Sequence, residues 1–292
     1  MKGIILTNAY TDIPQTRNAC ARLKEEFEKY GVFTDIRRND FIAAIISDGG
    51  NIKSKLCGYD FCIYLDKDKY IPYMLEGAGL KLFNSARAVE LCDDKMTTAL
   101  TLANSGIPMP ETLPGLLCYD EKAPLNENAL RIAAEELGYP LIVKSSFGSM
   151  GTGVFRADDF SQLKYAAGRL KMQPHLFQQY IKESEGRDIR VIVIGGKAVA
   201  AMERISGGDF RSNIAAGGKG RRIELPARAK EIAEKAARIL GLDYCGADIL
   251  FGRDGFYLCE VNSNAFFDGI ERVTGVNIAG LYAGHIIKTI GK

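Results

Sequence analysis

Histidine and closely spaced cysteine are scarce in this sequence of 292 residues, which has two histidines and seven cysteines without a CxxC pair. Zinc centres and disulfide frameworks need such ligands at short or regular spacings, so we expect neither here. Most of the cysteines lie among apolar neighbours and are better interpreted as small buried side chains. With two histidines in the chain, a His-based catalytic triad and a His-rich metal centre also have little support.

Long apolar runs and a large net charge are missing as well. No run approaches the roughly 18 apolar residues that a membrane helix needs. The first residues, MKGIILTNAYTD, are too short in their apolar part for a secretory signal and are interpreted as a first β-strand. The formal net charge is +2, which gives no reason to expect nucleic acid or an anionic membrane as a partner. We expect a cytoplasmic protein.

The composition is that of a soluble globular protein, with 47% hydrophobic and 25% charged residues. The length suffices for one large domain or for two to three small domains with cores of their own. Near the N-terminus, Ala19, Leu23 and Phe27 recur at helical spacing between apolar segments rich in β-forming residues. This alternation predicts a small parallel α/β layer, with strands at residues 2–7, 32–36 and 61–65.

The rest of the chain is predicted to form two α+β lobes. A helix is expected at residues 93–105, where Asp93 could cap its start and Gly106 end it. Three prolines between residues 108 and 114 then form a stiff linker. Further helices are expected near residues 126–138, 159–172, 228–240 and 276–289. Further strands are expected near residues 140–144, 153–156, 176–181, 188–194, 198–204, 243–251 and 256–261. We expect three domains, at residues 1–88, 89–183 and 184–292.

Two carboxylates and an amide are predicted to converge in the last third of the chain. Asp248 lies in an apolar segment typical of a strand, an Arg-Asp-Gly turn follows, and the next segment ends in Glu260-Val261-Asn262. Two antiparallel strands joined by that turn would bring Asp248 beside Glu260, and alternation would place Asn262 on the same face. Such hard oxygen ligands suit Mg²⁺. The alternative is that the two carboxylates are solvated or paired with a lysine.

Lys144 ends an apolar strand and is followed by a glycine-rich turn over residues 145–153. An ammonium group at a strand end and the backbone N–H groups of such a turn can surround phosphates. The turn is not a Walker A loop, which needs Gly-Lys-Ser or Gly-Lys-Thr after its second glycine. A plain glycine-rich hairpin is the alternative interpretation.

A basic, glycine-rich segment runs from Arg204 to Arg222 and includes Arg211. Long loops within compact chains are usually functional or disordered. Forked guanidinium groups suit a carboxylate, a phosphate or a developing phosphoryl charge. The alternative is a solvated surface loop.

The order of these elements resembles the RimK-like branch of the ATP-grasp ligases. The segments that carry the resemblance, in chain order, are Lys95, Lys144 before the glycine-rich turn, Gln-Gln-Tyr-Ile (178–181), Gly-Arg-Asp-Ile-Arg (186–190), Asp-Phe-Arg-Ser-Asn (209–213), Asp248 and Glu-Val-Asn (260–262). The resemblance covers about residues 90–290, and the first 85 residues fit the Rossmann-like domain that precedes the ATP-grasp fold in the family. It therefore implies a mixed α/β and α+β chain, an ATP-grasp fold behind a small Rossmann-like (pre-ATP-grasp) domain.

The resemblance also implies how ATP is bound. Lys95 and Lys144 would contact the phosphates and the edge of the nucleotide. Gln179 and Tyr180 would line the adenine slot mainly through backbone groups, and Asp188 would hold the ribose hydroxyls. The family often has Glu before this tyrosine; a backbone contact survives its replacement by Gln179.

The remaining matches concern group transfer and metal. By the resemblance, Arg204 and Arg211 would steady the acyl phosphate and the tetrahedral intermediate. Ser212 and Asn213 would lie beside them and, with Arg211, contact the nucleotide. The residues implied to bind one or two Mg²⁺ ions, or Mn²⁺, are Asp248, Glu260 and Asn262.

The implied activity is that of an ATP-dependent carboxylate–amine ligase, which forms ADP and passes through an acyl phosphate. Its partners would be a small-molecule or peptide carboxylate and an amino-acid amine such as glutamate, and homo-oligomers are common in the family. Residues 263–269 replace a Ser-Pro-Gly stretch that the family often has, and they should border the acceptor pocket. The alternatives are a ligase for another small-molecule or peptide acceptor, a kinase-like phosphotransferase on the same scaffold, and a nucleotide-binding module without catalysis.

Overall fold

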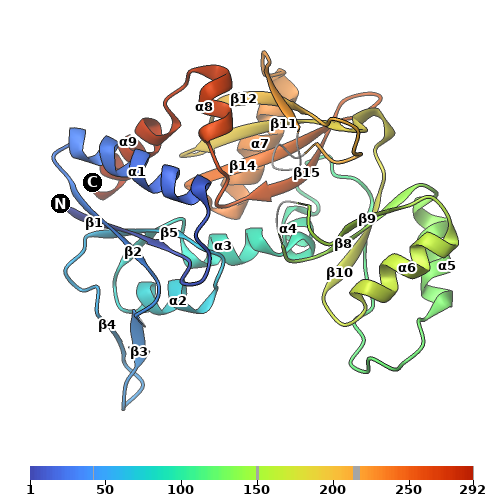
Figure 1. Cartoon of the computed structure of the whole chain (residues 1–292), viewed down its shortest axis with the longest axis horizontal. Coiled ribbons are helices and arrows are strands. Elements are labelled where there is room, and N and C mark those ends of the chain that lie inside the picture. Colours follow the sequence, from blue (N-terminus) through green and yellow to red (C-terminus); the bar gives the residue numbers. More distant parts are fainter. Residues whose placement is uncertain (42, 149–150, 213–217, 292) are drawn as a thin grey trace.

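The computed structural model describes residues 1–41, 43–148, 151–212 and 218–291. Its N-terminal part contains a parallel sheet in the order β2-β1-β5-β6, flanked by helices (Figure 1). The strands are β1 (Lys2–Thr7), β2 (Phe33–Arg38), β5 (Phe61–Leu65) and β6 (Lys81–Phe83), and the helices are α1 (Pro14–Lys29), α2 (Tyr70–Gly77) and α3 (Ala86–Asp93). A hairpin of β3 (Ala44–Ile46) and β4 (Ile52–Ser54) projects from this part. Strands β1 and β5 are buried on both faces, which is why they form continuous apolar runs.

The second part, here called the central lobe, is an antiparallel sheet in the order β7-β10-β8-β9 with two helices on one face (Figure 1). Its elements are β7 (Thr112–Pro114), α5 (Glu127–Leu137), β8 (Leu141–Ser145), β9 (Val154–Ala157), α6 (Phe160–Leu170) and β10 (His175–Gln179). Leu163 of α6 shares a buried cluster with Val143 and Phe177 of the sheet. Because side chains alternate along a strand, Lys144 and Gln178 face the opposite side.

The third part, the C-terminal sheet, is antiparallel in the order β13-β12-β11-β14-β15. Its elements are a 3-10 turn, η1 (Lys182–Ser184), then β11 (Arg187–Ile194), β12 (Lys197–Ile205), β13 (Lys219–Arg222), α7 (Ala227–Leu240), β14 (Tyr244–Phe251), β15 (Phe256–Asn262), α8 (Asp268–Thr274) and α9 (Ile278–Ile290). Helix α7 packs Ala233 and Ala236 against Val191 and Ala247 of the sheet. The residues that alternate with these, among them Asp248, are thereby turned to the other face.

Helix α9 returns to the N-terminal part and packs beside α1 (Figure 1). Tyr282 and Ile286 of α9 share one buried cluster with Phe27 and Ile63 of the N-terminal part and with Ile192 of the C-terminal sheet. The first and last thirds of the chain therefore have a common apolar core. Boundaries at residues 88 and 183 stay a prediction.

The helix predicted at residues 93–105 is present but shorter, and Asp93 as its cap is wrong. Helix α3 ends at Asp93, and a separate helix, α4 (Lys95–Leu102), begins after Asp94, which has an extended conformation. The carboxylate of Asp94 accepts hydrogen bonds from the backbone N–H groups of Met96 (2.9 Å) and Thr97 (3.2 Å). Asp94, rather than Asp93, is therefore the cap, and this cap separates the two helices.

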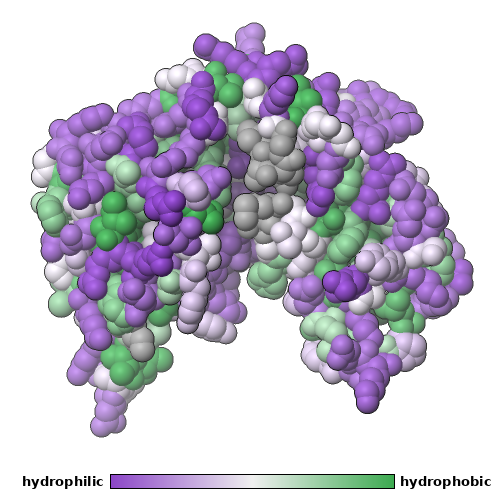
Figure 2. All heavy atoms as spheres, viewed as in Figure 1, coloured by the Kyte–Doolittle hydropathy of each residue, from purple (hydrophilic) through white to green (hydrophobic). Residues whose placement is uncertain are grey.

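The surface in Figure 2 is mostly hydrophilic and is divided by a deep notch between the N-terminal part and the central lobe. Large exposed apolar side chains occur as small groups, such as Ile45 and Ile46 on the β3–β4 hairpin. Among the described residues, no helix is both long and apolar enough to cross a membrane.

Candidate active site

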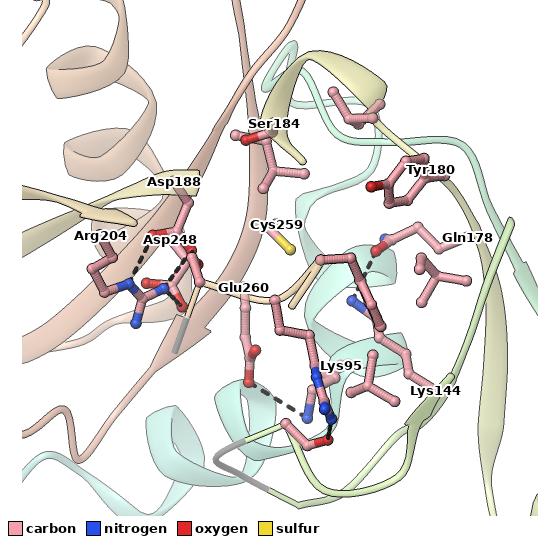
Figure 3. Close-up of a pocket in the computed structure, with 18 of the residues that line it drawn as sticks. Lys95, Lys144, Gln178, Tyr180, Ser184, Asp188, Arg204, Asp248, Cys259 and Glu260 are labelled. Carbon is pink, nitrogen blue, oxygen red and sulfur yellow. Dashed lines mark hydrogen bonds and ion pairs between the residues drawn. The ribbon is translucent and has the colours of Figure 1, made fainter. Parts of the chain in front are cut away.

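A cavity lies between the central lobe and the face of the C-terminal sheet opposite α7. Strands β8 and β10 form one wall, and β11, β12, β14 and β15 form the other (Figure 3). Every site residue predicted from the sequence that the structure describes lines this cavity: Lys95, Lys144, Gln179, Tyr180, Asp188, Arg204, Arg211, Ser212, Asp248, Glu260 and Asn262. Asn213 lies outside the described residues. Residues separated by more than 160 positions in the sequence thus meet in one place.

Lys144 is held in the wall by a relay of hydrogen bonds. It is the next-to-last residue of β8 and is only 5% exposed, and its Nζ donates to Gln178 Oε1 at 2.8 Å. The amide nitrogen of Gln178 in turn donates to the Thr112 hydroxyl at 2.9 Å. A buried ammonium group fixed in this way is a preorganised contact for an anion that enters the cavity.

Two cationic side chains bond backbone carbonyl oxygens of the glycine-rich turn. Lys95, at the start of α4, donates from Nζ to the carbonyl oxygen of Gly148 (2.9 Å) and lies 3.4 Å from Glu260 Oε1. Arg211 donates to the carbonyl oxygen of Gly151 (3.0 Å) and pairs with Asp209 at 2.7 Å. The hydrogen bond with Asp209 raises the pKa of Arg211. Two cationic groups therefore lie at this turn, each beside a carboxylate.

Four charged side chains, three of them buried and Arg190 partly buried, form a network on the C-terminal sheet. Arg204 donates from Nε to Asp188 Oδ1 (2.7 Å) and from Nη2 to Asp188 Oδ2 (2.5 Å). The same Nη2 lies 2.9 Å from Asp248 Oδ2. Arg190 forms a bidentate pair with Asp248, in which Nη2 lies 2.9 Å from Oδ2. The two positive and two negative charges balance, which offsets the cost of removing them from water. Figure 3 labels Arg204, Asp188 and Asp248 of this network.

Strand pairing explains why these four side chains meet. Asp188 and Arg190 lie two positions apart on β11 and so share a face. Asp188 is opposite Arg204 on β12, and Arg190 is opposite Asp248 on β14. Cross-strand neighbours have Cβ atoms about 4.5–5.5 Å apart, close enough for direct ion pairs.

The network controls the charge of its members. Burial alone would raise the pKa of Asp248, but Arg190 and Arg204 together lower it below its ordinary value. Burial likewise opposes the charge of Arg204, yet the two neighbouring carboxylates raise the pKa of this guanidinium. Asp248 is therefore a carboxylate at neutral pH, with negative charge on its oxygens.

A β-bulge shapes the acidic end of the cavity. Asp248 on β14 is opposite Glu260 on β15, but the next pair joins Ile249 to Leu258, so Cys259 is the extra residue. Bulges re-aim side chains, and Cys259 and Glu260 both line the cavity although they are adjacent in sequence. Burial raises the pKa of the Cys259 thiol to about 11. The thiol is thus neutral, and the charge at this end belongs to the carboxylates.

The acidic end fits a small hard cation. Asn262 is opposite Gly246, in the same two-strand ladder that pairs Asp248 with Glu260. Three carboxylate, thiol or imidazole groups do not gather into a metal-holding cluster among the described residues. Mg²⁺ does not need such a cluster, because it typically takes one or two carboxylates together with waters and substrate phosphates. Two carboxylates and an amide oxygen are consistent with that preference.

A second cavity, with a volume of about 840 Å³, adjoins the first. It is bordered by the start of α1, by the end of β5, by residues 263–269 and by α8. Arg190, Arg204 and Asn262 line both cavities. The buried charge network therefore stands where the two spaces meet.

The segment after β10 forms the far end of the first cavity. The backbone N–H of Gln179 donates to the carbonyl oxygen of Glu111 (2.8 Å), so this amide is already bonded. The guanidinium of Arg156 lies over the ring of Tyr180, 4.8 Å from the ring centroid. Burial raises the pKa of the Tyr180 hydroxyl, which stays neutral. An aromatic side chain held in this position offers a flat apolar surface to the cavity (Figure 3).

Comparison with known proteins decides the family. Residues 92–290 match the family model described as the RimK-like ATP-grasp domain. The chain belongs to this family. The resemblance inferred from ordered motifs is thereby confirmed.

Two relatives and one solved structure illustrate this RimK-like family. Beta-citrylglutamate synthase B of Danio rerio is 36% identical over 228 residues, which are 77% of this chain and 55% of that protein. The probable alpha-L-glutamate ligase of Enterobacter sp. (strain 638) is 38% identical over 200 residues, 68% of this chain and 64% of that protein. This chain thus spans little more than half the length of the first relative. The crystal structure of a RimK domain ATP-grasp protein from Sphaerobacter thermophilus aligns over 98% of this chain and 99% of that one, with a TM-score of 0.73 and 20% identity, which shows the fold.

Some lining residues of this RimK-like site were not singled out from the sequence. Arg190 lies in the Gly-Arg-Asp-Ile-Arg motif, and its spacing of two from Asp188 could have placed it on the same face of a strand. Gln178 was similarly detectable as the direct neighbour of Gln179 in the Gln-Gln-Tyr-Ile motif. Cys259 was not singled out either, although pairing counted back from Phe251 and Phe256 would place it opposite Asp248.

Proposed function

We propose that this chain is an ATP-dependent carboxylate–amine ligase that forms ADP and works through an acyl phosphate. The observation that carries the proposal is the junction of the two cavities at Arg190, Arg204 and Asn262. ATP in the first cavity would direct its terminal phosphate toward a carboxylate in the second. Activation of a free carboxylate requires its oxygen to become a leaving group, and phosphorylation achieves this.

The chain's own residues would bind and orient the nucleotide. Lys95 and Lys144 supply two ammonium groups near the glycine-rich turn, where the phosphates would lie. The ring of Tyr180 offers a stacking surface for the adenine, and backbone groups next to Gln179 would form hydrogen bonds with the edge of the adenine. Asn213, which lies outside the described residues, is proposed to contact the nucleotide together with Arg211 and Ser212.

Asp248, Glu260 and Asn262 would hold one or two Mg²⁺ ions. When bound, the ion supplies positive charge that neutralises the nucleotide phosphates. Arg204 is fixed by its carboxylate partners through Nε and Nη2, and its Nη1 has no hydrogen-bond partner among the described residues. This free edge, together with Arg211, would donate hydrogen bonds where negative charge grows during phosphoryl and acyl transfer.

The substrates are proposed from the relatives. The names of the two relatives, beta-citrylglutamate synthase and alpha-L-glutamate ligase, share glutamate. We propose glutamate, or another amino acid, as the amine. The acceptor would be a small-molecule or peptide carboxylate in the second cavity, whose volume of about 840 Å³ exceeds what one amino acid needs.

The test is release of ADP and phosphate from MgATP with a panel of carboxylates, each with and without glutamate. We expect release only when both substrates are present, and an amide product by mass spectrometry. The Glu260→Gln variant, purified in parallel, controls for contaminating ATPase. Phosphate retained on the product would support a kinase-like transfer instead, and release without a carboxylate would contradict the ligase.

A further inference from the structure

The end of β15 and the loop after it, residues 261–265, are held from outside by several hydrogen bonds. The thiol of Cys92 donates to the carbonyl oxygen of Val261 at 3.0 Å. The side-chain amide of Asn264 donates to the carbonyl oxygen of Asp66 at 2.8 Å. The hydroxyl of Tyr244 donates to the carbonyl oxygen of Ala265 at 2.6 Å. Two of these three contacts come from the N-terminal third of the chain, which lies outside the C-terminal sheet.

Asn84 makes the most complete set of these contacts. It lies between β6 and α3 and is 3% exposed. Its Nδ2 donates to the carbonyl oxygens of Tyr244 (2.8 Å) and Ser263 (3.0 Å), and its Oδ1 accepts from the N–H of Tyr244 (2.9 Å). Both amide hydrogens and the amide oxygen are therefore used, and a flipped amide would place donor against donor.

The partners of Asn84 lie at one end of the β14–β15 ladder. Tyr244 is the first residue of β14, and Ser263 directly follows the last residue of β15, Asn262. Asn262 is opposite Gly246, two positions from Tyr244. Asn84 thus joins the two strands beyond their last backbone pair, immediately beside the proposed amide ligand.

The space around Asn262 leaves little freedom for that end. A Cβ atom at Gly246 would lie 2.5 Å from the Cβ of Ala265 and 3.0 Å from Cδ of Arg190. The 261–265 loop and the partly buried Arg190 therefore pack directly on the ladder at Gly246. Displacement of Ser263 or Ala265 would move Asn262 relative to Asp248 and Glu260.

We propose that Asn84 is a positioning residue for the metal site, which fixes the end of β15 so that Asn262 lies beside the two carboxylates. The inference rests on the proposed metal role of Asn262. It assigns the N-terminal part, through one buried amide, a share in the geometry of a site formed by the C-terminal sheet. Residues that orient metal ligands typically change metal affinity or activity by about 10–100-fold when they are replaced.

The experiment measures Mn²⁺ binding to the full chain by electron paramagnetic resonance, with a non-hydrolysable ATP analogue present and without turnover. We expect the Mn²⁺ midpoint of Asn84→Ala to rise about tenfold or more. Tyr244→Phe keeps the ring and removes the hydrogen bond to Ala265, so we expect a smaller rise. Leu56→Ala is the matched control, because Leu56 is 1% exposed in a separate N-terminal cluster. It should lower the Tm without moving the midpoint.

Glu260→Gln separates the two ways in which the inference can fail. If Glu260→Gln loses Mn²⁺ while Asn84→Ala and Tyr244→Phe titrate like Leu56→Ala, Asn84 has no positioning role and the metal site stands. If Glu260→Gln binds Mn²⁺ like the wild type, the metal assignment is wrong and the inference falls with it. If Asn84→Ala does not fold, Asn84→Asp decides, because it keeps the shape and the acceptor oxygen but loses the hydrogen bonds donated to Tyr244 and Ser263; a wild-type midpoint in that variant overturns the proposal.

Discussion

Replacement of Asp188 by Asn distinguishes two roles for this carboxylate. The family resemblance implies a contact with the ribose hydroxyls, whereas in the structure both oxygens are already bonded. Oδ1 accepts from Arg204, and Oδ2 accepts from Arg204 and from the Ser212 hydroxyl at 2.6 Å. An asparagine offers one acceptor oxygen and turns N–H donors toward the guanidinium. We therefore expect Asp188 to act mainly by holding Arg204.

The structure gives the size of the expected effect. Hydrogen bonds to charged groups are worth about 1.5–3 kcal/mol each, and loss of one partner from a buried ion pair costs about 3–5 kcal/mol of stability. Asp248 still holds one side of Arg204 in the variant, so we expect a loss of about 3 kcal/mol in the free energy of unfolding. If the displaced Arg204 no longer supplies about 2.7 kcal/mol of transition-state stabilisation, kcat falls about 100-fold.

The assay is steady-state kinetics with the carboxylate and amine that give turnover, at temperatures well below the Tm of the variant. We expect the KM for ATP to stay within about threefold of the wild type while kcat falls. Asp243→Asn is the control, because Asp243 directly precedes β14, pairs with His285 of α9 (2.8 Å) and lines neither cavity.

The opposite result refutes the reasoning. A KM for ATP raised about tenfold with kcat unchanged would mean that Asp188 binds the ribose, since one lost hydrogen bond of about 1.4 kcal/mol has that effect. A double-mutant cycle with Arg204→Met provides a second check. If Asp188 acts through Arg204, the double variant is no slower than Arg204→Met alone.

Three further predictions concern the metal site, the phosphoryl and acyl transfer step and the pH dependence of stability. Asp248→Asn and Glu260→Gln should each nearly abolish turnover, because each weakens the proposed metal site; full activity in either at low Mg²⁺ would remove it from that site. Arg211→Ala should lower kcat more than it raises the KM for ATP, and an unchanged kcat would exclude it from the transfer step. Burial would raise the pKa of Glu26, but Lys29 and other neighbours lower it below the usual 4.5. The stabilisation of the fold by ionised Glu26 is thus complete above about pH 4.5 and is lost as the pH falls through the lower pKa of the folded state. In urea unfolding, Glu26→Gln should therefore lower the free energy of unfolding by about 1–3 kcal/mol at pH 7 and by less in acid.

Much of the fold and of the candidate site could be predicted because the signals are local. Apolar runs and helical spacing placed most of the longer strands and helices within a few residues of their observed bounds. The turn after Phe251 indicated that Asp248 and Glu260 lie on adjacent antiparallel strands, as they do. What is not local was missed: the return of α9 to α1 depends on packing between residues more than 250 positions apart.

The partners of Asp188 show a second limit of sequence reasoning. The two glycines at 195–196 form a tight turn in which Ile194 is opposite Lys197. Continued pairing from that turn would place Asp188 opposite Glu203, two carboxylates facing each other. In the structure Ile192 pairs with Ala200 and Val193 with Ala198, so Val199 is an extra residue. The register beyond it is shifted by one, and Arg204 takes the position opposite Asp188.

A β-bulge also sets the strand pairing at the other side of the site. Pairing counted back from Phe251 and Phe256 would bring the Cys259 thiol, not a carboxylate, opposite Asp248; the bulge at Cys259 brings Glu260 there instead. A shift of one residue exchanges the two faces of a strand, so each bulge decides which side chains enter the cavity. One bulge replaces a repulsive carboxylate pair by an ion pair, and the other places two carboxylates side by side where a cation would relieve their repulsion. The chemistry proposed for the site therefore depends on two single-residue irregularities in otherwise regular strands, and in both hairpins uninterrupted pairing from the turn would give a different partner.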